Sequence, residues 1–394
     1  MGVVRVVDVD QPPWAVTIDT QTRHAFVAGG TGAASHNNVT MIDAATGRIV
    51  RTVPADLYPT ALAIDERTER AFVVNSAATT VGVVDTRSGR SLRAVSVPLH
   101  PLHVVIASAD GRAFVTGFAV QGGAEQVSVL DTTSGRLLRT VTVGPPATGG
   151  PATAAIAMDE GTHHAFVVTG NGVSVLDTRS GSPLHHIRFV VGTTVAVTVA
   201  SRTHRVFITM MGRPMGTCAS PSCALAGSGV VMLDARTGQL QRTVTVGSLP
   251  WTLAVDERTS HVFVADRGNN DSDPGRVYML DTRSGQLLRT TAVSKGPDAL
   301  AVDTRRGRIV VVGSATDILD ATTGALIGAI GVVGNAVAID EHAGHALVAA
   351  SGGTQLRPNP LHQIPLVDRF FPGALAVRTS SKVSILDYNR FGHN

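Results

Sequence analysis

Short apolar stretches, each followed by a polar turn, make up almost the whole chain. The clearest example runs from Val39 through Asp43 to Gly47, with apolar and polar positions alternating before the aspartate. Period-two alternation predicts a half-buried strand. Aspartate accepts hydrogen bonds from turn N–H groups, and glycine adopts the positive φ that a tight turn requires. The phrase therefore predicts a strand that ends in a hairpin.

This phrase recurs along the chain, which indicates a repeat protein. Further copies span 81–89, 127–135, 173–181, 230–238 and 277–285, with a degenerate copy at 316–324 and a truncated one at 383–387. The aspartates return about every 49 residues, within the range of propeller blades. One strand follows each hairpin turn and a strand pair precedes it, as at 61–65 and 70–74. Four-stranded units (A to D) without helix-period segments predict an all-β fold, a β-propeller.

The repeat count predicts eight blades. The A–B signature occurs eight times, but strand D occurs only seven times within the repeats. Residues 3–14 align without a gap on 240–251, so we expect residues 1–10 to be the closing outer strand of the last blade. This closure removes open sheet edges. Seven blades is the alternative, because 297–334 is short and the last blade is irregular.

We expect one propeller domain over 1–394, with a long insertion at 351–382 in the last blade. The pattern leaves two segments open for the second strand of that blade, 346–350 and 374–378.

The segments 70–75 and 81–85 carry a recognisable resemblance. The run Arg70-Ala71-Phe72-Val73-Val74-Asn75, followed by Val81-Gly82-Val83-Val84-Asp85, resembles the YVTN-type β-propeller repeat family of bacterial and archaeal surface proteins. The resemblance covers nearly the whole chain. It implies a propeller and favours an extracellular or periplasmic location, although the printed sequence opens without the pattern of a secretion signal. Related propellers include lactonases, lyases and haem-carrying domains, so the resemblance leaves the activity open.

Composition excludes several classes of protein. Apolar residues make up 43% and charged residues 16%, which excludes a disordered chain. The chain has only 2 lysines beside 31 arginines and only 6 glutamates beside 24 aspartates. Because lysine and glutamate favour helices, this composition disfavours a mainly helical protein. The net charge is +3, and the arginines are spread at repeat spacing rather than in runs, so we expect no nucleic-acid partner. No apolar run is long enough to predict a membrane span.

Many charged residues occupy repeat positions and so predict structural roles. The residue that opens strand B is cationic in all eight repeats: His24, Arg70, Arg112, His164, Arg205, His261, Arg308 and His345. Strand A usually ends in aspartate, so we expect a local ion pair across the A–B turn rather than a metal ring. Arginines on strand D are expected to discourage pairing of sheet edges.

The long B–C loops hold the residues that the repeat does not require. They span 29–38, 117–126, 210–229, 266–276 and 351–382. Cys218 and Cys223, the two cysteines of the chain, are expected to form a local disulfide; free thiols and a soft metal site are the alternatives. Asn269, Asp271 and Asp273 suggest a calcium site, although the loop lacks EF-hand spacing and a self-capped polar loop is the alternative.

Candidate functional side chains lie mainly on the D–A and B–C loops, which emerge on the same side of every blade. His36, His100, His103 and His362 are weak candidates for general bases or metal ligands. Trp14 and Trp251 occupy the same repeat position; they either pack or offer a stacking platform for a sugar or ring ligand. Arg213 and Arg267 are cationic ligand-binding candidates on two long loops.

The chain contains no catalytic motif that specifies a reaction. It has no Gly-x-Ser-x-Gly, His-Glu-x-x-His, Walker or Cys-x-x-Cys-His sequence. We therefore predict an extracellular propeller that binds a protein, glycan or small-molecule ligand on its long-loop face, with no cofactor evident beyond calcium. The alternatives are a lactonase, lyase or hydrolase with a histidine or metal site at the channel mouth, and a non-covalent haem or quinone carrier.

Overall fold

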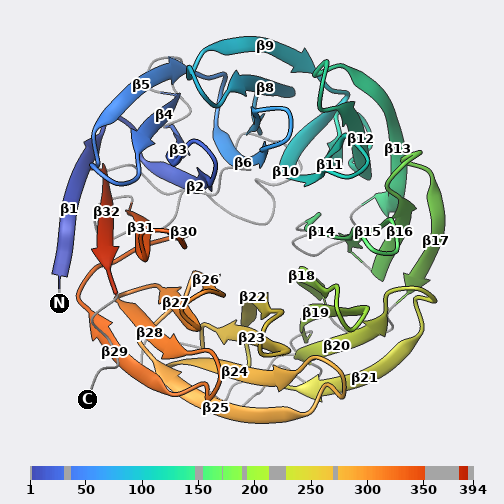
Figure 1. Ribbon diagram of the computed structural model, residues 1–394. Helices are drawn as coiled ribbons and strands as arrows, with labels where there is room; N and C mark the ends of the chain where they lie inside the picture. Colours follow the sequence, from blue (N-terminus) through green and yellow to red (C-terminus); the bar gives the residue numbers. More distant parts are fainter. Residues whose placement is uncertain are drawn as a thin grey trace, which may run out of the picture. The chain divides into compact units, whose positions relative to one another are not determined.

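The fold is an eight-bladed β-propeller, as the repeat count predicts. The computed structural model describes residues 2–30, 37–146, 154–170, 172–188, 193–212, 228–268, 274–350 and 381–388. These residues form 32 strands in eight four-stranded antiparallel sheets (Figure 1), and they include no helix. No helix in this part of the chain therefore has the length and apolarity needed to cross a bilayer. The alternative count of seven blades is wrong.

The blades belong to two compact units. The first contains Met1–Thr142 and Gly334–Arg390, and the second contains Val143–Val333 and Phe391–Asn394. The boundary falls within the outer strand of blade 3.

Blades 8, 1, 2 and 3 form the first unit. Blade 1 contains β2 (Pro13–Asp19), β3 (His24–Gly29), β4 (Asn38–Asp43) and β5 (Ile49–Pro54). Blade 2 contains β6 (Pro59–Asp65), β7 (Arg70–Asn75), β8 (Thr80–Asp85) and β9 (Ser91–Ser96). Blade 3 contains β10 (Leu99–Ala107), β11 (Arg112–Ala119), β12 (Ala124–Asp131) and β13 (Leu137–Pro146). Blade 8 contains β30 (Ala336–Asp340), β31 (His345–Ala350), β32 (Ser381–Asp387) and β1 (Gly2–Val9).

Blades 4 to 7 form the second unit. Blade 4 contains β14 (Ile156–Asp159), β15 (His164–Thr169), β16 (Gly172–Asp177) and β17 (Pro183–Arg188). Blade 5 contains β18 (Thr193–Ala200), β19 (Arg205–Met211), β20 (Gly229–Asp234) and β21 (Leu240–Thr245). Blade 6 contains β22 (Pro250–Asp256), β23 (His261–Asp266), β24 (Gly275–Asp281) and β25 (Leu287–Val293). Blade 7 contains β26 (Ala299–Asp303), β27 (Arg308–Val312), β28 (Thr316–Asp320) and β29 (Leu326–Ile330).

Blade 8 joins the two ends of the chain, which confirms the closing strand. β1 runs antiparallel to β32 from Gly2 opposite Asp387 to Val9 opposite Ser381, and the two strands lie side by side in Figure 1. The second strand of this blade is β31, which pairs with both β30 and β32. The competing segment 374–378, like most of the insertion 351–382, lies outside the described residues.

The core lies between neighbouring blades. The phenylalanines of strand B are fully buried, and each interblade cluster combines aliphatic side chains from two blades; in blades 2 and 3, for example, Phe72 and Val74 share a cluster with Val104 and Val115. Strand D is mostly exposed, because no sheet covers the outer side of a blade. The buried phenylalanines are Phe26, Phe72, Phe114, Phe166, Phe207 and Phe263.

The aspartate at the end of strand C builds the C–D turn, as predicted. In blade 2 the Asp85 carboxylate accepts hydrogen bonds from the N–H and O–H of Ser88, and Gly89 follows at φ 64°. Partial burial raises the pKa of Asp85, but these hydrogen bonds outweigh it and hold the pKa below its ordinary value of 3.8. The same balance lowers the pKa of the equivalent carboxyl group in the other blades for which this turn is described: Asp43, Asp131, Asp177, Asp234, Asp281 and Asp320.

The A–B turns differ from the expected ion pairs. The aspartate that ends strand A is buried and accepts turn N–H groups, as Asp256 accepts from Arg258. The arginine that opens strand B binds the strand C aspartate in three blades, in the pairs Arg112–Asp131, Arg205–Asp234 and Arg308–Asp320, whereas Arg70 donates to the Thr132 carbonyl of the next blade. In blades 3 and 5 strand A ends in alanine, so only the strand C aspartate lies opposite Arg112 and Arg205. Arg308 lies opposite both Asp303 and Asp320 and binds Asp320, the more exposed of the two carboxylates. His24, His164 and His261 bind a backbone carbonyl of the next blade.

Candidate functional site

Many of the predicted loop residues lie outside the described part of the chain. This holds for the proposed disulfide, the calcium candidates, one arginine and two of the four candidate histidines. Those predictions therefore stay predictions. The residues concerned are Cys218, Cys223, Asn269, Asp271, Asp273, Arg213, His36 and His362.

Two of the predicted ligand-binding residues come together on blade 6. The guanidinium carbon of Arg267 lies 3.6 Å from the centre of the Trp251 ring, a cation–π stack. Arg267 also forms an ion pair with Asp298, in the segment that leads into blade 7. The side chains of Arg267 and Asp298 remain 20% and 19% exposed, so this stack is partly open to solvent.

The strand ends of blade 6 hold this stack rigidly. Trp251 is the second residue of β22, and Arg267 directly follows β23, whose last residue Asp266 lies opposite Pro250. The buried Asp266 carboxylate accepts the N–H groups of Ser248 and Leu249. Because backbone bonds fix both strand ends, the stack is formed before any ligand arrives.

The other tryptophan has a different environment. The indole Nε1–H of Trp14 donates to the carbonyl of Gly30 at 2.9 Å. Gly30 occupies the place that Arg267 has in blade 6, and a Cβ added there would lie 2.0 Å from Oδ1 of Asn37. A side chain at position 30 would therefore have to displace Asn37, and the repeat equivalence of the two tryptophans does not extend to their surroundings.

The two described candidate histidines lie on β10 of blade 3. His100 is half-buried and opposite Phe118, whereas His103 is exposed and opposite Thr116. Burial lowers the pKa of His100, and a hydrogen bond with the Ser76 backbone raises it by less, so the imidazole is neutral at neutral pH. Within the described ranges, no three or more His, Cys, Asp or Glu side chains are grouped to hold a metal ion.

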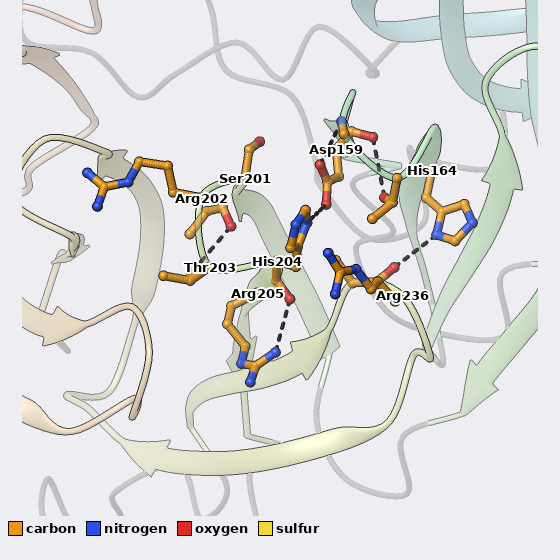
Figure 2. Close-up of polar contacts among 12 residues, drawn as sticks. Asp159, His164, Ser201, Arg202, Thr203, His204, Arg205 and Arg236 are labelled. Carbon is orange, nitrogen blue, oxygen red and sulfur yellow. Dashed lines mark hydrogen bonds and ion pairs between the residues drawn. The ribbon is translucent and has the colours of Figure 1, made fainter.

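A polar network at the A–B turns of blades 4 and 5 was missed by the sequence reasoning. Figure 2 shows the imidazole of His204 pointing at the carboxylate of Asp159, with 3.0 Å between Nδ1 and Oδ2. Asp159 is fully buried and also accepts the N–H of Gly161. In the same view His164 binds the Ala235 carbonyl at 2.9 Å.

This histidine–aspartate pair has a structural counterpart elsewhere in the chain. Arg23, at the same turn position as His204, reaches the strand A aspartate of the preceding blade, Asp340, at 3.5 Å. Both pairs are explained by one position of the repeat, whose side chain binds the strand A aspartate of the preceding blade. In the sequence, this position is the residue just before the cation that opens strand B: His204 precedes Arg205, and Arg23 precedes His24.

Comparisons with known proteins show the fold and no family. No family model matches the sequence, and no curated protein matches it. The chain is similar to a solved structure of hydrazine synthase from Kuenenia stuttgartiensis, with a TM-score of 0.63 and 15% identity over 80% of this chain and 98% of that chain. It is similar to BamB from Moraxella catarrhalis, with a TM-score of 0.60 and 16% identity over 89% of this chain and 97% of that one.

A designed protein has the same degree of likeness. The computationally designed Ika8 protein gives a TM-score of 0.64 and 16% identity over 88% of this chain and 96% of its own. Identities this low show a shared fold and carry no activity from one protein to another.

Proposed function

We propose that this protein is a binding propeller that holds a ligand or a partner at the D–A and B–C loop ends of its blades. The observation that carries this proposal is the partly open stack of Trp251 and Arg267, which β22 and β23 hold in place. Sites built on strand ends are more precise than sites on loops alone.

The chemistry of the stack favours a ring ligand that bears an acidic group. A planar guanidinium presents several N–H donors in a fixed fork that matches a carboxylate. Asp298 binds Nη2 of Arg267, so the acidic group of a ligand would have to bind other N–H groups of the fork or displace the Asp298 carboxylate. The ring of such a ligand would stack on the exposed part of the guanidinium plane. Among the proposed partners, an acidic sugar fits both features best.

Tryptophan fluorescence tests this proposal directly. The chain has two tryptophans, so Trp14→Phe leaves Trp251 as the single reporter. We expect oligogalacturonate to change the fluorescence of this variant saturably, and the neutral maltose oligomers to change it far less. Arg267→Lys keeps the charge but removes the planar fork, so it should weaken binding by about tenfold.

The control is an arginine at the opposite end of the same blade. Arg283→Ala alters the exposed C–D turn of blade 6 and should bind as the parent does. If Arg267→Lys and Arg283→Ala bind equally well, or if neither saccharide changes the signal, the assignment of this site is wrong.

We also propose an extracellular or periplasmic location, membership of the YVTN-type repeat family, a Cys218–Cys223 disulfide and calcium on Asn269, Asp271 and Asp273. The spacing of the cysteines and the resemblance support the first three, and alternating oxygen ligands support the fourth.

Alkylation without reductant, followed by mass spectrometry, should leave both cysteines unmodified. Two alkylated cysteines in the exported protein would remove the argument for an oxidising compartment.

A further inference from the structure

Arg267 has a partner on each of two sides. Its guanidinium carbon lies 3.6 Å from the centre of the Trp251 ring, and its Nη2 donates to the Asp298 carboxylate. Trp251 and Arg267 belong to blade 6, where Trp251 lies on β22 and Arg267 follows β23. Asp298 directly precedes β26 of blade 7. One blade therefore supplies the stack, and the next blade supplies the anion that the guanidinium binds.

The nitrogen that Asp298 occupies is the one that a bidentate ligand needs. A carboxylate forms two parallel hydrogen bonds with a guanidinium, either side-on to Nε and Nη2 or end-on to Nη1 and Nη2. Both arrangements include Nη2. The Nε atom of Arg267 is buried, so only the end-on arrangement is open to a ligand. A ligand carboxylate that binds both nitrogens must therefore take Nη2 from Asp298.

Asp298 is the member of the pair that can move. The Arg267 guanidinium lies against the indole, and the Arg267 N–H donates to the Leu249 carbonyl at 3.1 Å. The main chain of Asp298 is also fixed, because its N–H donates to the Val312 carbonyl at 2.7 Å. Its side chain, however, is short, rotates about the Cα–Cβ bond and is 19% exposed. The carboxylate can therefore turn into water while Arg267 stays stacked.

The exchange of one carboxylate for another costs little free energy. A partly exposed ion pair contributes far less than a buried one, since water solvates both charges when they separate. A ligand carboxylate also replaces the bond that Nη2 loses. A neutral sugar hydroxyl forms a weaker hydrogen bond with a guanidinium than a carboxylate does, so it does not displace Asp298.

We propose that Asp298 is an internal competitor for the acidic group of the ligand. Without ligand, the Asp298 carboxylate occupies Nη2 of Arg267 and neutralises its charge. When the ligand binds, this carboxylate leaves Nη2 and the ligand carboxylate takes its place. Asp298 thus lowers the affinity for acidic ligands and excludes neutral saccharides, which cannot displace it. This inference rests on the proposed function and names a residue that sets the specificity of that site.

Fluorescence titration of Asp298→Asn tests the competitor. The parent of the series is Trp14→Phe, in which Trp251 is the single reporter. We expect Asp298→Asn in this background to bind oligogalacturonate about fivefold more tightly than the parent, because a neutral amide is a weaker acceptor and holds Nη2 less firmly. A residue that merely positioned Arg267 would give the opposite result, since its replacement would weaken binding.

Two further variants serve as controls. Asp298→Glu keeps a carboxylate within reach of Nη2, so its affinity should stay within about twofold of the parent. Asp10→Asn removes an exposed negative charge from the other compact unit and changes the net charge by the same amount. It should bind oligogalacturonate as the parent does.

Carbon-13 nuclear magnetic resonance observes the displacement itself. The side-chain carboxyl signal of Asp298 is assigned as the one that Asp298→Asn lacks. We expect this signal to shift when the parent is saturated with oligogalacturonate, towards the position of an aspartate in water. Maltose oligomers should leave it in place.

The outcomes separate this inference from the proposed function. If the parent binds oligogalacturonate but Asp298→Asn binds it equally or more weakly, or if the Asp298 signal does not move, Asp298 is no competitor and the binding site stands. If neither protein binds, both proposals fail. Binding by Asp298→Asn alone supports the competitor. Should Asp298→Asn melt far below the parent, the carboxyl signal of the parent decides.

Discussion

Asp317 shows how one residue can hold two blades together at a cost in free energy. It lies on β28 of blade 7 and is 3% exposed, and its carboxylate accepts both the N–H and the hydroxyl of Ser294, in the segment that enters this blade. Burial raises the pKa of Asp317 above its ordinary value of 3.8, and the two hydrogen bonds offset only part of this effect. The folded protein therefore favours the protonated form more than the unfolded chain does.

Replacing this carboxylate by an amide should stabilise the protein at neutral pH. A raised pKa means that the stability contributed by Asp317 is present below pH 3.8 and is lost as the pH rises through the folded-state pKa. Asp317→Asn keeps an acceptor for the Ser294 N–H and removes the buried charge. We expect its melting temperature to exceed that of the parent at neutral pH and the difference to vanish below pH 3.8. A lower melting temperature at neutral pH would contradict this account.

The turn aspartates have the opposite dependence. Their pKa values lie below 3.8 in the folded protein, so their contribution is present above that value and is lost as the pH falls through the folded-state pKa. We expect the free energy of unfolding to fall below about pH 4, and to fall less steeply in Asp281→Asn. Urea unfolding at a series of pH values measures both slopes; equal slopes would exclude a role for this turn.

At the scale of strands and turns, neighbouring blades change the meaning of the sequence pattern. Alternation predicts a strand with one buried face, but both faces of strands B and C are buried, because each faces a different neighbouring blade. The strand D arginines show a second role. Arg93 and Arg242 donate to the C–D turn of the next blade, so these side chains connect blades in addition to the edge protection expected of them.

The A–B turns share one backbone conformation with different side chains. The residue before strand B has positive φ in every blade, and five blades place a residue other than glycine there: Arg23, Glu69, His163, His204 and Ser260. Blades 3, 7 and 8 use glycine, at Gly111, Gly307 and Gly344.

Substitutions at this turn position should have unequal effects in blades 6 and 7. Gly307→Ala places a Cβ at φ 63°, 2.6 Å from the Arg258 guanidinium, and should destabilise the protein by about 1–2 kcal/mol. Ser260→Gly relieves the same strain but makes the unfolded chain more flexible, so we expect a change within about 1 kcal/mol. Chemical denaturation measures both. A loss in Ser260→Gly as large as that in Gly307→Ala would show that backbone strain does not decide stability here.

At the scale of the whole molecule, the two ends of the chain share one blade. β1 covers β32, and Val7 and Val9 join the cluster that also contains Leu347, Val383 and Ile385. Deleting residues 2–9 should therefore lower the melting temperature strongly, because β32 loses its pairing partner and this cluster loses two side chains. An unchanged melting temperature would refute the closing role of β1.

Adjacent valines of β1 give a matched pair of point variants. Val7 is 6% exposed and Val6 is 44% exposed. We expect Val7→Ala to destabilise the protein by about 1–3 kcal/mol, since it removes buried methyl groups. Val6→Ala should stay within about 0.5 kcal/mol of the parent. Equal effects would mean that β1 adds no buried face to blade 8.

The sequence alone determined the blades. Hairpins depend on contacts between residues close in the chain, and the aspartate and glycine that build each C–D turn recur at a fixed spacing, so repeat alignment predicted the eight blades and the closing strand. It also identified Trp251 and Arg267 as separate candidates. Their stack, and the pairing of Arg267 with Asp298, became visible only in the fold, because Asp298 belongs to the segment of a different blade.

Only the tertiary structure decided what happens between blades. The bonds between Asp317 and Ser294 and the Asp159–His204 pair join residues that are distant in sequence, and no local pattern shows which face of a strand meets which neighbour.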